Sequence, residues 1–198
     1  MHTKTKLGLV AGACTLVLAP AAMALTIIGT EEDDKILGSR QDDRIKALAG
    51  NDLVHAFGGD DQVHAGQGDD RVGGYDGADE IRGKTGNDRV RAGDGADYVA
   101  AGPGVDAISG GDGHDLLTAA AHEDVPLEGV DVIVAGNDND RIRARDGEPD
   151  EIDCGKGKRD RALLDLVDVI VDATPENPNG SCEAVLRAVV PPDKPAPE

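Results

Sequence analysis

Hydrophobic positions in this chain recur at a fixed interval of nine residues, with mostly polar or small residues on either side. Ten consecutive positions hold a branched aliphatic residue: Ile36, Ile45, Val54, Val63, Val72, Ile81, Val90, Val99, Ile108 and Leu117. This alternation is typical of a short β-strand with one inward-facing side chain. Because one aliphatic side chain cannot bury itself, the pattern predicts many stacked strands that share a narrow core.

A glycine-rich segment with one aspartate precedes each of these aliphatic positions. The aspartates lie two residues before the aliphatic residue and are Asp34, Asp43, Asp52, Asp61, Asp70, Asp79, Asp88, Asp97, Asp106 and Asp115. Eight of the ten have glycine two residues earlier, and all ten have Gly or Ala five residues earlier. Each unit is therefore small-x-x-Gly-x-Asp-x-aliphatic-x, in which glycine permits the sharp turn between strands.

Two units of nine residues form one coil, with a strand on each side and a turn at each end. The aspartates then form two ladders with an 18-residue step, one along each edge of the stack. Carboxylates in adjacent coils, about 5 Å apart, repel strongly unless a cation lies between them. Calcium suits this gap, since it accepts six to eight oxygen ligands in flexible geometry, whereas magnesium demands a tighter octahedron.

These units resemble the RTX family, the nonapeptide repeats of calcium-binding hemolysins and secreted proteases. The best copy is 110–118, and the resemblance is strong over 29–118 and weak over 129–153. It implies an all-β, right-handed parallel β-roll (a β-solenoid) with several calcium ions held between turns by the ten aspartates and loop carbonyls. The first two sites are expected to be weak or absent, because Glu32 and Gln41 replace the turn glycine.

The repeat loses its regularity after residue 118. We expect a bulged loop at 119–130 and degenerate units to 153, so that the β-roll spans 25–153. Residues 154–190 are interpreted as a C-terminal cap of irregular strands, and 191–198 as a disordered tail. The ending is similar to that of secreted actinobacterial repeat proteins.

Cysteine usage and the N-terminus predict export. Residues 1–24 have a positive start, a short apolar run and a small-x-small cleavage site, which are typical of a signal peptide. Cys14 lies inside that run, and its lipidation is the less favoured alternative. The two remaining cysteines, Cys154 and Cys182, are an even number in an exported chain and predict one disulfide that fastens the cap. The expected location is therefore secreted and extracellular.

Charge narrows the choice of partner. The formal net charge of −19 favours multivalent cations and disfavours nucleic acid and anionic membranes, and no membrane insertion is expected. Outward strand positions hold the basic residues Arg44, Lys46, Arg71, Arg82, Arg89 and Arg91. They are interpreted as solvating a sheet face rather than as binding an acidic polysaccharide. His55 and His64 fall on opposite sheets and cannot share a metal ion.

Catalytic motifs are not found in the sequence, so the chain is not expected to be an enzyme. The favoured function is secreted calcium binding coupled to folding, in an extracellular structural or interaction module. The alternatives are a β-helix polysaccharide-active enzyme, which needs carboxylates outside the repeat register, and a cell-surface adhesin.

Overall fold

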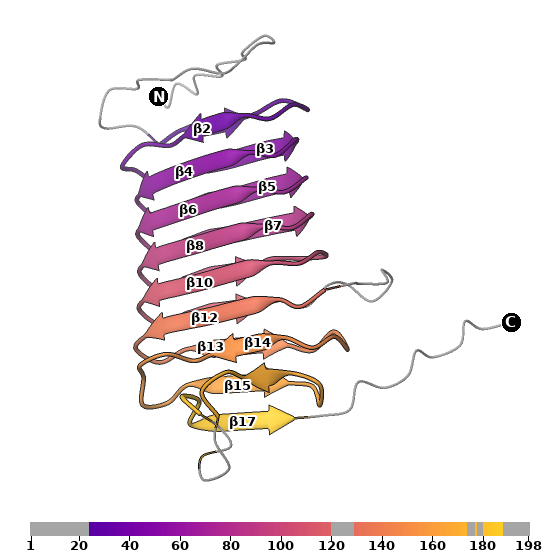
Figure 1. Ribbon diagram of the computed structural model, residues 1–198. Coiled ribbons are helices and arrows are strands. Elements are labelled where there is room, and N and C mark those ends of the chain that lie inside the picture. The colour runs from indigo at the N-terminus through magenta and orange to yellow at the C-terminus, as the bar shows by residue number, and fades with distance from the viewer. Residues whose placement is uncertain (1–23, 120–128, 174–176, 178–179, 188–198) are drawn as a thin grey trace, which may run out of the picture.

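The computed structural model describes residues 24–119, 129–173, 177 and 180–187. Within these ranges the chain is a parallel β-solenoid without helices, and its coils follow one another from the N-terminal to the C-terminal end (Figure 1). The predicted all-β parallel fold class is thus confirmed. The signal-peptide prediction (1–24, except Ala24), most of the expected 119–130 loop and the predicted tail lie outside the described residues.

Odd-numbered strands form one sheet, called here the odd sheet. Its strands are β1 (Thr26–Ile28), β3 (Arg44–Ala49), β5 (Gln62–Gln67), β7 (Glu80–Thr85), β9 (Tyr98–Ala100), β11 (Leu116–Thr118), β13 (Arg141–Ala144), β15 (Arg161–Leu164) and β17 (Ala184–Arg187). Each strand pairs in parallel with the strand of the next coil, so that Ile45 lies beside Val63 and Val63 beside Ile81.

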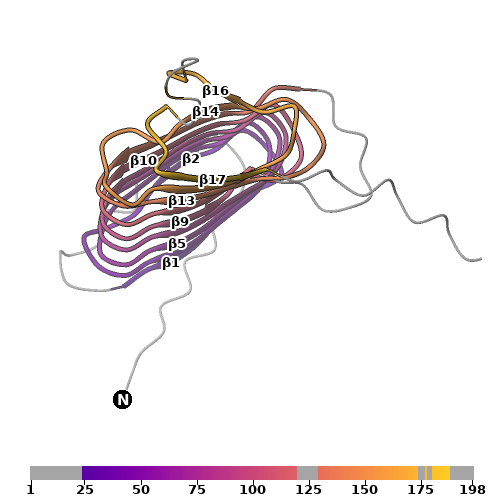
Figure 2. The same ribbon diagram turned by 90° about the horizontal axis from the view of Figure 1, so that it is seen from below.

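Even-numbered strands form the opposite, even sheet. Its strands are β2 (Lys35–Leu37), β4 (Leu53–Gly58), β6 (Arg71–Asp76), β8 (Arg89–Asp94), β10 (Ala107–Asp112), β12 (Val132–Asn137), β14 (Glu151–Asp153) and β16 (Val169–Ile170). Viewed along the stack, the coils superimpose and the two sheets face each other across a narrow interior (Figure 2). His55 in β4 and His64 in β5 lie on different sheets, as the repeat predicted.

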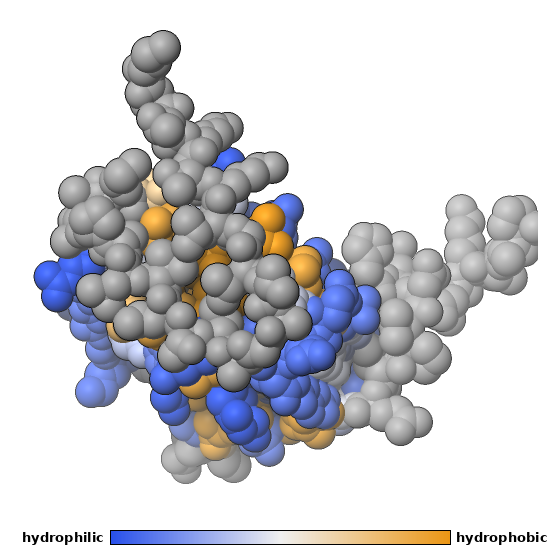
Figure 3. Space-filling model, turned by 90° about the horizontal axis from the view of Figure 1, so that it is seen from above, coloured by the Kyte–Doolittle hydropathy of each residue, from blue (hydrophilic) through white to orange (hydrophobic). Residues whose placement is uncertain are grey.

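The core contains two columns of side chains per sheet, not one. The full-length strands have six residues, and both the aliphatic residue and the small residue two positions later are buried, as for Val54 and Ala56. The expectation of a single inward-facing residue was therefore wrong. The unit's Gly or Ala is a core residue because the sheets leave no room there for a larger side chain. Seen from the β1 and β2 end, mostly hydrophilic residues surround the few apolar ones in the described surface (Figure 3).

The coils continue through the region expected to form the cap. β12 pairs with β10 across the break in the repeat, which places Ile133 beside Ile108. Strands β14 to β17 then extend both sheets in parallel register, joined by loops of irregular length. Cys154 and Cys182 form the predicted disulfide, with a Cα–Cα distance of 5.2 Å. No helix in the described part of the chain is long and apolar enough to cross a membrane.

Candidate metal centre

The repeat aspartates lie directly before each strand and are linked through the stack by hydrogen bonds. The backbone N–H of each aspartate donates to the Oδ1 of the aspartate one coil later, for example Asp70 to Asp88 at 2.9 Å. One ladder contains Asp34, Asp52, Asp70, Asp88, Asp106, Asp131, Asp150 and Asp168. The other contains Asp43, Asp61, Asp79, Asp97, Asp115, Asp140 and Asp160.

The second carboxylate oxygen of most rungs is buried without a partner. All ten repeat aspartates are at most 8% exposed. Oδ2 accepts no hydrogen bond in Asp52, Asp61, Asp70, Asp79, Asp88, Asp97, Asp106, Asp115, Asp140, Asp150 and Asp160. A buried carboxylate oxygen without a donor carries a large desolvation cost unless a cation neutralises it.

Carbonyl oxygens converge on the same space. A β-carbon built on Gly83 would overlap the Asp88 Oδ2 and lie 2.7 Å from the carbonyl oxygen of Ala101, one coil later. A carboxylate and a carbonyl oxygen converge in the same way beside Gly74 and Gly110. Asp88 Oδ2 has no donor, and a carbonyl oxygen such as that of Ala101, which already accepts one N–H, keeps a second lone pair. Such a pair of oxygens fits calcium, which binds carboxylate and backbone carbonyl oxygens.

A left-handed turn residue accompanies a free Oδ2 in most units, although Asp150 and Asp160 have a free Oδ2 without one. In nine units the residue four before the aspartate has a positive φ; these residues are Leu48, Phe57, Gly66, Tyr75, Lys84, Gly93, Gly102, Gly111 and Gly136. Every aspartate that follows one of them has an unpartnered Oδ2. The N–H of Lys84, for instance, donates to the Ala101 carbonyl at 2.7 Å instead of to Asp88. The left-handed turn thus keeps a backbone donor away from the oxygen that would face a metal ion.

The first two turns differ in this respect. Thr30 and Ser39 lack a positive φ, and their N–H groups donate to Oδ2 of Asp34 and Asp43, both at 2.6 Å. These oxygens are therefore satisfied by the chain itself. Calcium ligation by Asp34 and Asp43 stays a prediction, and the geometry offers it less support than in the other eight.

Burial makes the ladder resist ionisation when no cation is present. Burial is the largest cause that raises the pKa of Asp61, Asp79, Asp88, Asp106 and Asp115 to about 7, opposed in part by the backbone hydrogen bond to Oδ1. Charges on neighbouring aspartates raise these pKa values further. Ionised at neutral pH, the ladder would destabilise its own fold, which makes a bound cation the natural complement.

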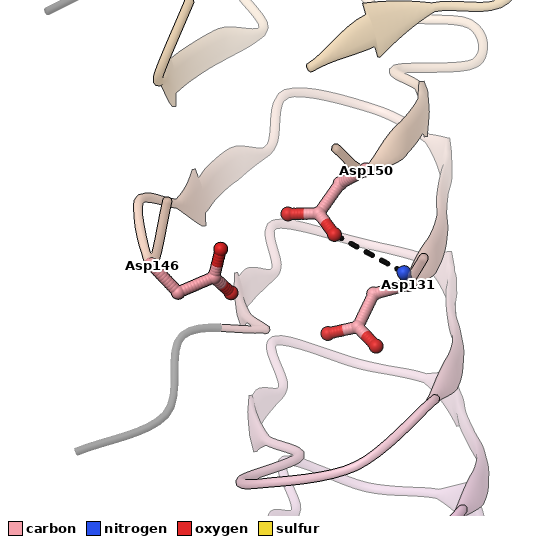
Figure 4. A group of neighbouring side chains, drawn as sticks. All are labelled: Asp131, Asp146 and Asp150. Atoms are coloured by element: carbon pink, nitrogen blue, oxygen red, sulfur yellow. Dashed lines mark hydrogen bonds between the residues drawn. The ribbon is translucent and has the colours of Figure 1, made fainter. Parts of the chain in front are cut away.

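The structure adds carboxylates that the sequence prediction did not include. Asp131, Asp146 and Asp150 place carboxylate oxygens within 4.8 Å of one another, and Asp146 points toward the other two from across the turn (Figure 4). Burial, and then the charge of Asp146, raise the pKa of Asp150 to about 8. Asp146 lies four residues before Asp150, so it could have been identified only by extending the repeat register past the insertion in that unit.

Glu183 completes the second ladder at its C-terminal end. Its Oε2 accepts the N–H of Asp160 at 2.7 Å, so a glutamate takes the place of the next aspartate. It directly follows Cys182, and the disulfide to Cys154 holds this final coil against the one before it. The nine-residue spacing gives no signal for Glu183, because 23 residues separate it from Asp160.

Fold and site together define a parallel β-solenoid with two buried carboxylate ladders at its turns. The family model described as RTX calcium-binding nonapeptide repeat (4 copies) matches residues 26–53, 37–72, 73–108, 101–125 and 127–148. These segments cover more than half of the chain, which therefore belongs to the RTX calcium-binding repeat family. Comparison with curated proteins gave no match.

Proposed function

We propose that this chain is an exported calcium-binding protein whose folding is coupled to the binding of several calcium ions. The observation that carries the proposal is the row of buried, unpartnered Oδ2 atoms beside converging carbonyl oxygens. Bound calcium would offset the charge of carboxylates that the fold otherwise buries at a cost. The residues of the chain supply the oxygens, hold Oδ1 in place and keep backbone donors away from Oδ2.

Calcium specificity follows from the same features. The ligand oxygens come from successive coils of a regular stack, so their number and spacing suit a large ion with flexible coordination. Magnesium needs a near-ideal octahedron and retains its water, which makes it a matched control of the same charge.

Circular dichroism of the purified chain tests the coupling. With calcium we expect strong β-sheet signal, and with excess chelator, or with magnesium at the same concentration, a largely disordered spectrum. Equal strand content with calcium and with chelator would refute the coupling of folding to calcium. Equal strand content with magnesium would refute the selectivity for calcium.

Export and an extracellular structural or interaction role belong to the same proposal. The N-terminal segment has the features of a signal peptide, and a disulfide between Cys154 and Cys182 suits an oxidising compartment. Mass spectrometry of protein recovered from culture medium should give an N-terminus at Leu25 and two fewer hydrogens than the reduced chain. Recovery only from cells, with residues 1–24 retained, would contradict the export.

A further inference from the structure

Two of the three aromatic side chains of Phe and Tyr type lie next to each other on the outer face of the even sheet. Phe57 in β4 pairs in register with Tyr75 in β6, and their rings stack with centroids 5.5 Å apart. His55 lies 5.7 Å from the Tyr75 ring, and its Nδ1 is 2.5 Å from the tyrosine hydroxyl. Both rings nevertheless remain about two-fifths exposed, at 40% and 42%. In a chain with so few aromatics, this is a concentrated and partly solvated apolar surface.

The backbone conformation at these positions suits glycine rather than an aromatic residue. Phe57 and Tyr75 both have a φ of 82°, in the left-handed region that L residues avoid. Gly93, Gly111 and Gly136 follow in the same column of the sheet, also at positive φ, and a β-carbon on Gly93 would overlap the Tyr75 carbonyl. The turn requires the positive φ, but it does not require an aromatic side chain. Leu48 and Lys84 have the same backbone conformation on the odd sheet, so the feature that distinguishes Phe57 and Tyr75 is the pair of stacked, partly exposed rings.

A groove lies beside the rings. The Tyr75 ring lies over Gly73, in the space that a β-carbon there would occupy, with ring carbon Cε2 2.8 Å from that position. A hollow of about 690 Å³ extends from here across neighbouring strands, and Arg71, Arg89 and Arg91 also line it. The small residues at the base and the fixed tyrosine above them form a preorganised surface of aromatic and cationic groups.

The arginines of this groove form no salt bridge with any residue that the structure describes. Arg71 and Arg89 are cross-strand neighbours, a like-charge pairing that normally destabilises a sheet. The salt bridge that the described residues do form joins Arg82 to Glu80, and both of these lie on the odd sheet. In β4, β6, β8 and β10 the first, third and fifth residues face outward, and none of them is Asp or Glu. In a chain with a net charge of −19, such a face is complementary to an anionic ligand.

We infer that this aromatic groove, which His55, Arg71, Tyr75, Arg89 and Arg91 line and beside which Phe57 stacks on Tyr75, binds an acidic polysaccharide. The exposed ring faces would stack on sugar rings, and the guanidinium groups would pair with uronic acid carboxylates. Adjacent strands are about 4.8 Å apart, close to the rise of one sugar residue along a polysaccharide, so the neighbouring Arg71 and Arg89 can reach neighbouring sugars, one of them a uronic acid.

A polysaccharide fits this face better than a nucleic acid does. Asp76, Asp94 and Asp112 end β6, β8 and β10 and would repel a densely charged phosphate backbone more strongly than a sparsely charged polysaccharide. A uronic acid polymer carries fewer charges per unit length and presents apolar sugar faces to the rings. For the even sheet this proposal departs from the sequence interpretation of the arginines as solvating groups, which stays a prediction, while Arg82 on the odd sheet has an acidic partner.

Calorimetry with hyaluronan oligosaccharides tests the inference, with the folded protein in saturating calcium. N-acetylglucosamine oligomers serve as the neutral sugar and oligodeoxythymidine as the nucleic acid. Tyr75→Gly removes the ring and relieves the backbone, so this variant should fold at least as stably as the wild type. Leu48→Gly is the matched control, because Leu48 has a φ of 92° at the same repeat position on the odd sheet.

We expect Tyr75→Gly and Arg91→Gln each to weaken hyaluronan binding at least about tenfold. Leu48→Gly and Arg44→Gln, the charge control on the odd sheet, should leave it within about twofold of the wild type. Equal loss in the controls, absence of hyaluronan binding, or equal affinity for the neutral sugar would each overturn the inference. Tighter binding of oligodeoxythymidine that is lost in the same two groove variants would overturn it in favour of a nucleic acid site.

Discussion

Replacing one buried ladder carboxylate by its amide should have opposite effects with and without calcium. Asp88→Asn keeps the side-chain volume and the Oδ1 that accepts the Asp70 N–H at 2.9 Å. It replaces the unpartnered Oδ2, at a residue that is 1% exposed, by an uncharged NH2 group. The variant therefore removes the buried charge with little change in shape.

The magnitude without calcium follows from the pKa of Asp88. Burial, and then the charges of Asp70 and Asp69, raise this pKa from 3.8 to about 7. At 1.36 kcal/mol per pH unit, ionising Asp88 in the metal-free fold costs at most about 4 kcal/mol. Because the pKa of the folded state is the higher one, the stability linked to this group is present below about 3.8 and is lost as the pH rises through about 7.

The assay is strand content of calcium-stripped protein, followed by circular dichroism as the pH is raised from about 5.5 to 8. The wild type should lose β-sheet signal as the ladder ionises, and Asp88→Asn should retain it to higher pH. In saturating calcium the order reverses, because the variant lacks a charged ligand. A lost site costs about 3 kcal/mol when calcium is present at a hundred times its Kd.

Asp76→Asn is the matched control. Asp76 is an exposed strand-end aspartate, so this variant makes the same charge change outside the ladder. It should shift neither the metal-free pH profile nor the calcium-loaded melting temperature appreciably. If Asp88→Asn destabilised the chain equally with and without calcium, the carboxylate would be serving as a structural hydrogen-bond acceptor and the reasoning would be refuted.

The remaining predictions concern the core, the disulfide, the turn strain and proton release. Ile81→Ala removes a side chain that is 0% exposed and should lower the free energy of unfolding by about 2 to 5 kcal/mol. Denaturant titration of the calcium-loaded protein measures this, and a negligible change would exclude a tightly packed core. Reduction of the Cys154–Cys182 disulfide should cost about 3 kcal/mol, measured by calcium-loaded thermal unfolding with and without reductant, and an unchanged Tm would show that it adds nothing to stability. Leu48→Gly should stabilise the chain by about 1 kcal/mol by relieving a φ of 92°, and a loss of stability would count against backbone strain there. Calcium binding at about pH 5.5, where the metal-free protein should still be folded, should release protons, because several ladder aspartates in that fold have a pKa of about 7. Calorimetry in buffers of different ionisation enthalpy should detect this release, and a heat independent of buffer would contradict it.

The repeat made most of the fold predictable from the sequence. Aliphatic residues nine apart specify strands, and an 18-residue coil brings Asp52 beside Asp70, where the Asp52 N–H donates to Asp70 Oδ1 at 2.8 Å. The second buried column could not be recognised from the sequence, because it consists of Gly and Ala, and small residues of this kind also occur in the turns. The free Oδ2 could not be predicted either, since in most units it accompanies a positive φ, and residues such as Leu48 and Lys84 rarely adopt that conformation.

Irregular coil lengths made the C-terminal part of the two ladders hard to predict from the sequence. Between Asp106 and Asp131 the step is 25 residues, and between Asp140 and Asp160 it is 20. A ladder tolerates such loops because the hydrogen bond from one rung to the next fixes only the turn itself. The cluster of Phe57 and Tyr75 did have a signal, since the two residues are separated by one 18-residue coil, but their exposure and backbone conformation became visible only in the structure.

The number of calcium ions bound per folded chain tests the central claim most directly. Calorimetric titration of the chain from residue 25 onward, paired with elemental analysis of the dialysed protein, measures this stoichiometry. The two ladders of unpartnered carboxylate oxygens predict several ions that bind cooperatively as the strand signal appears. One ion or none per chain, with the β-solenoid fully folded, would contradict the account.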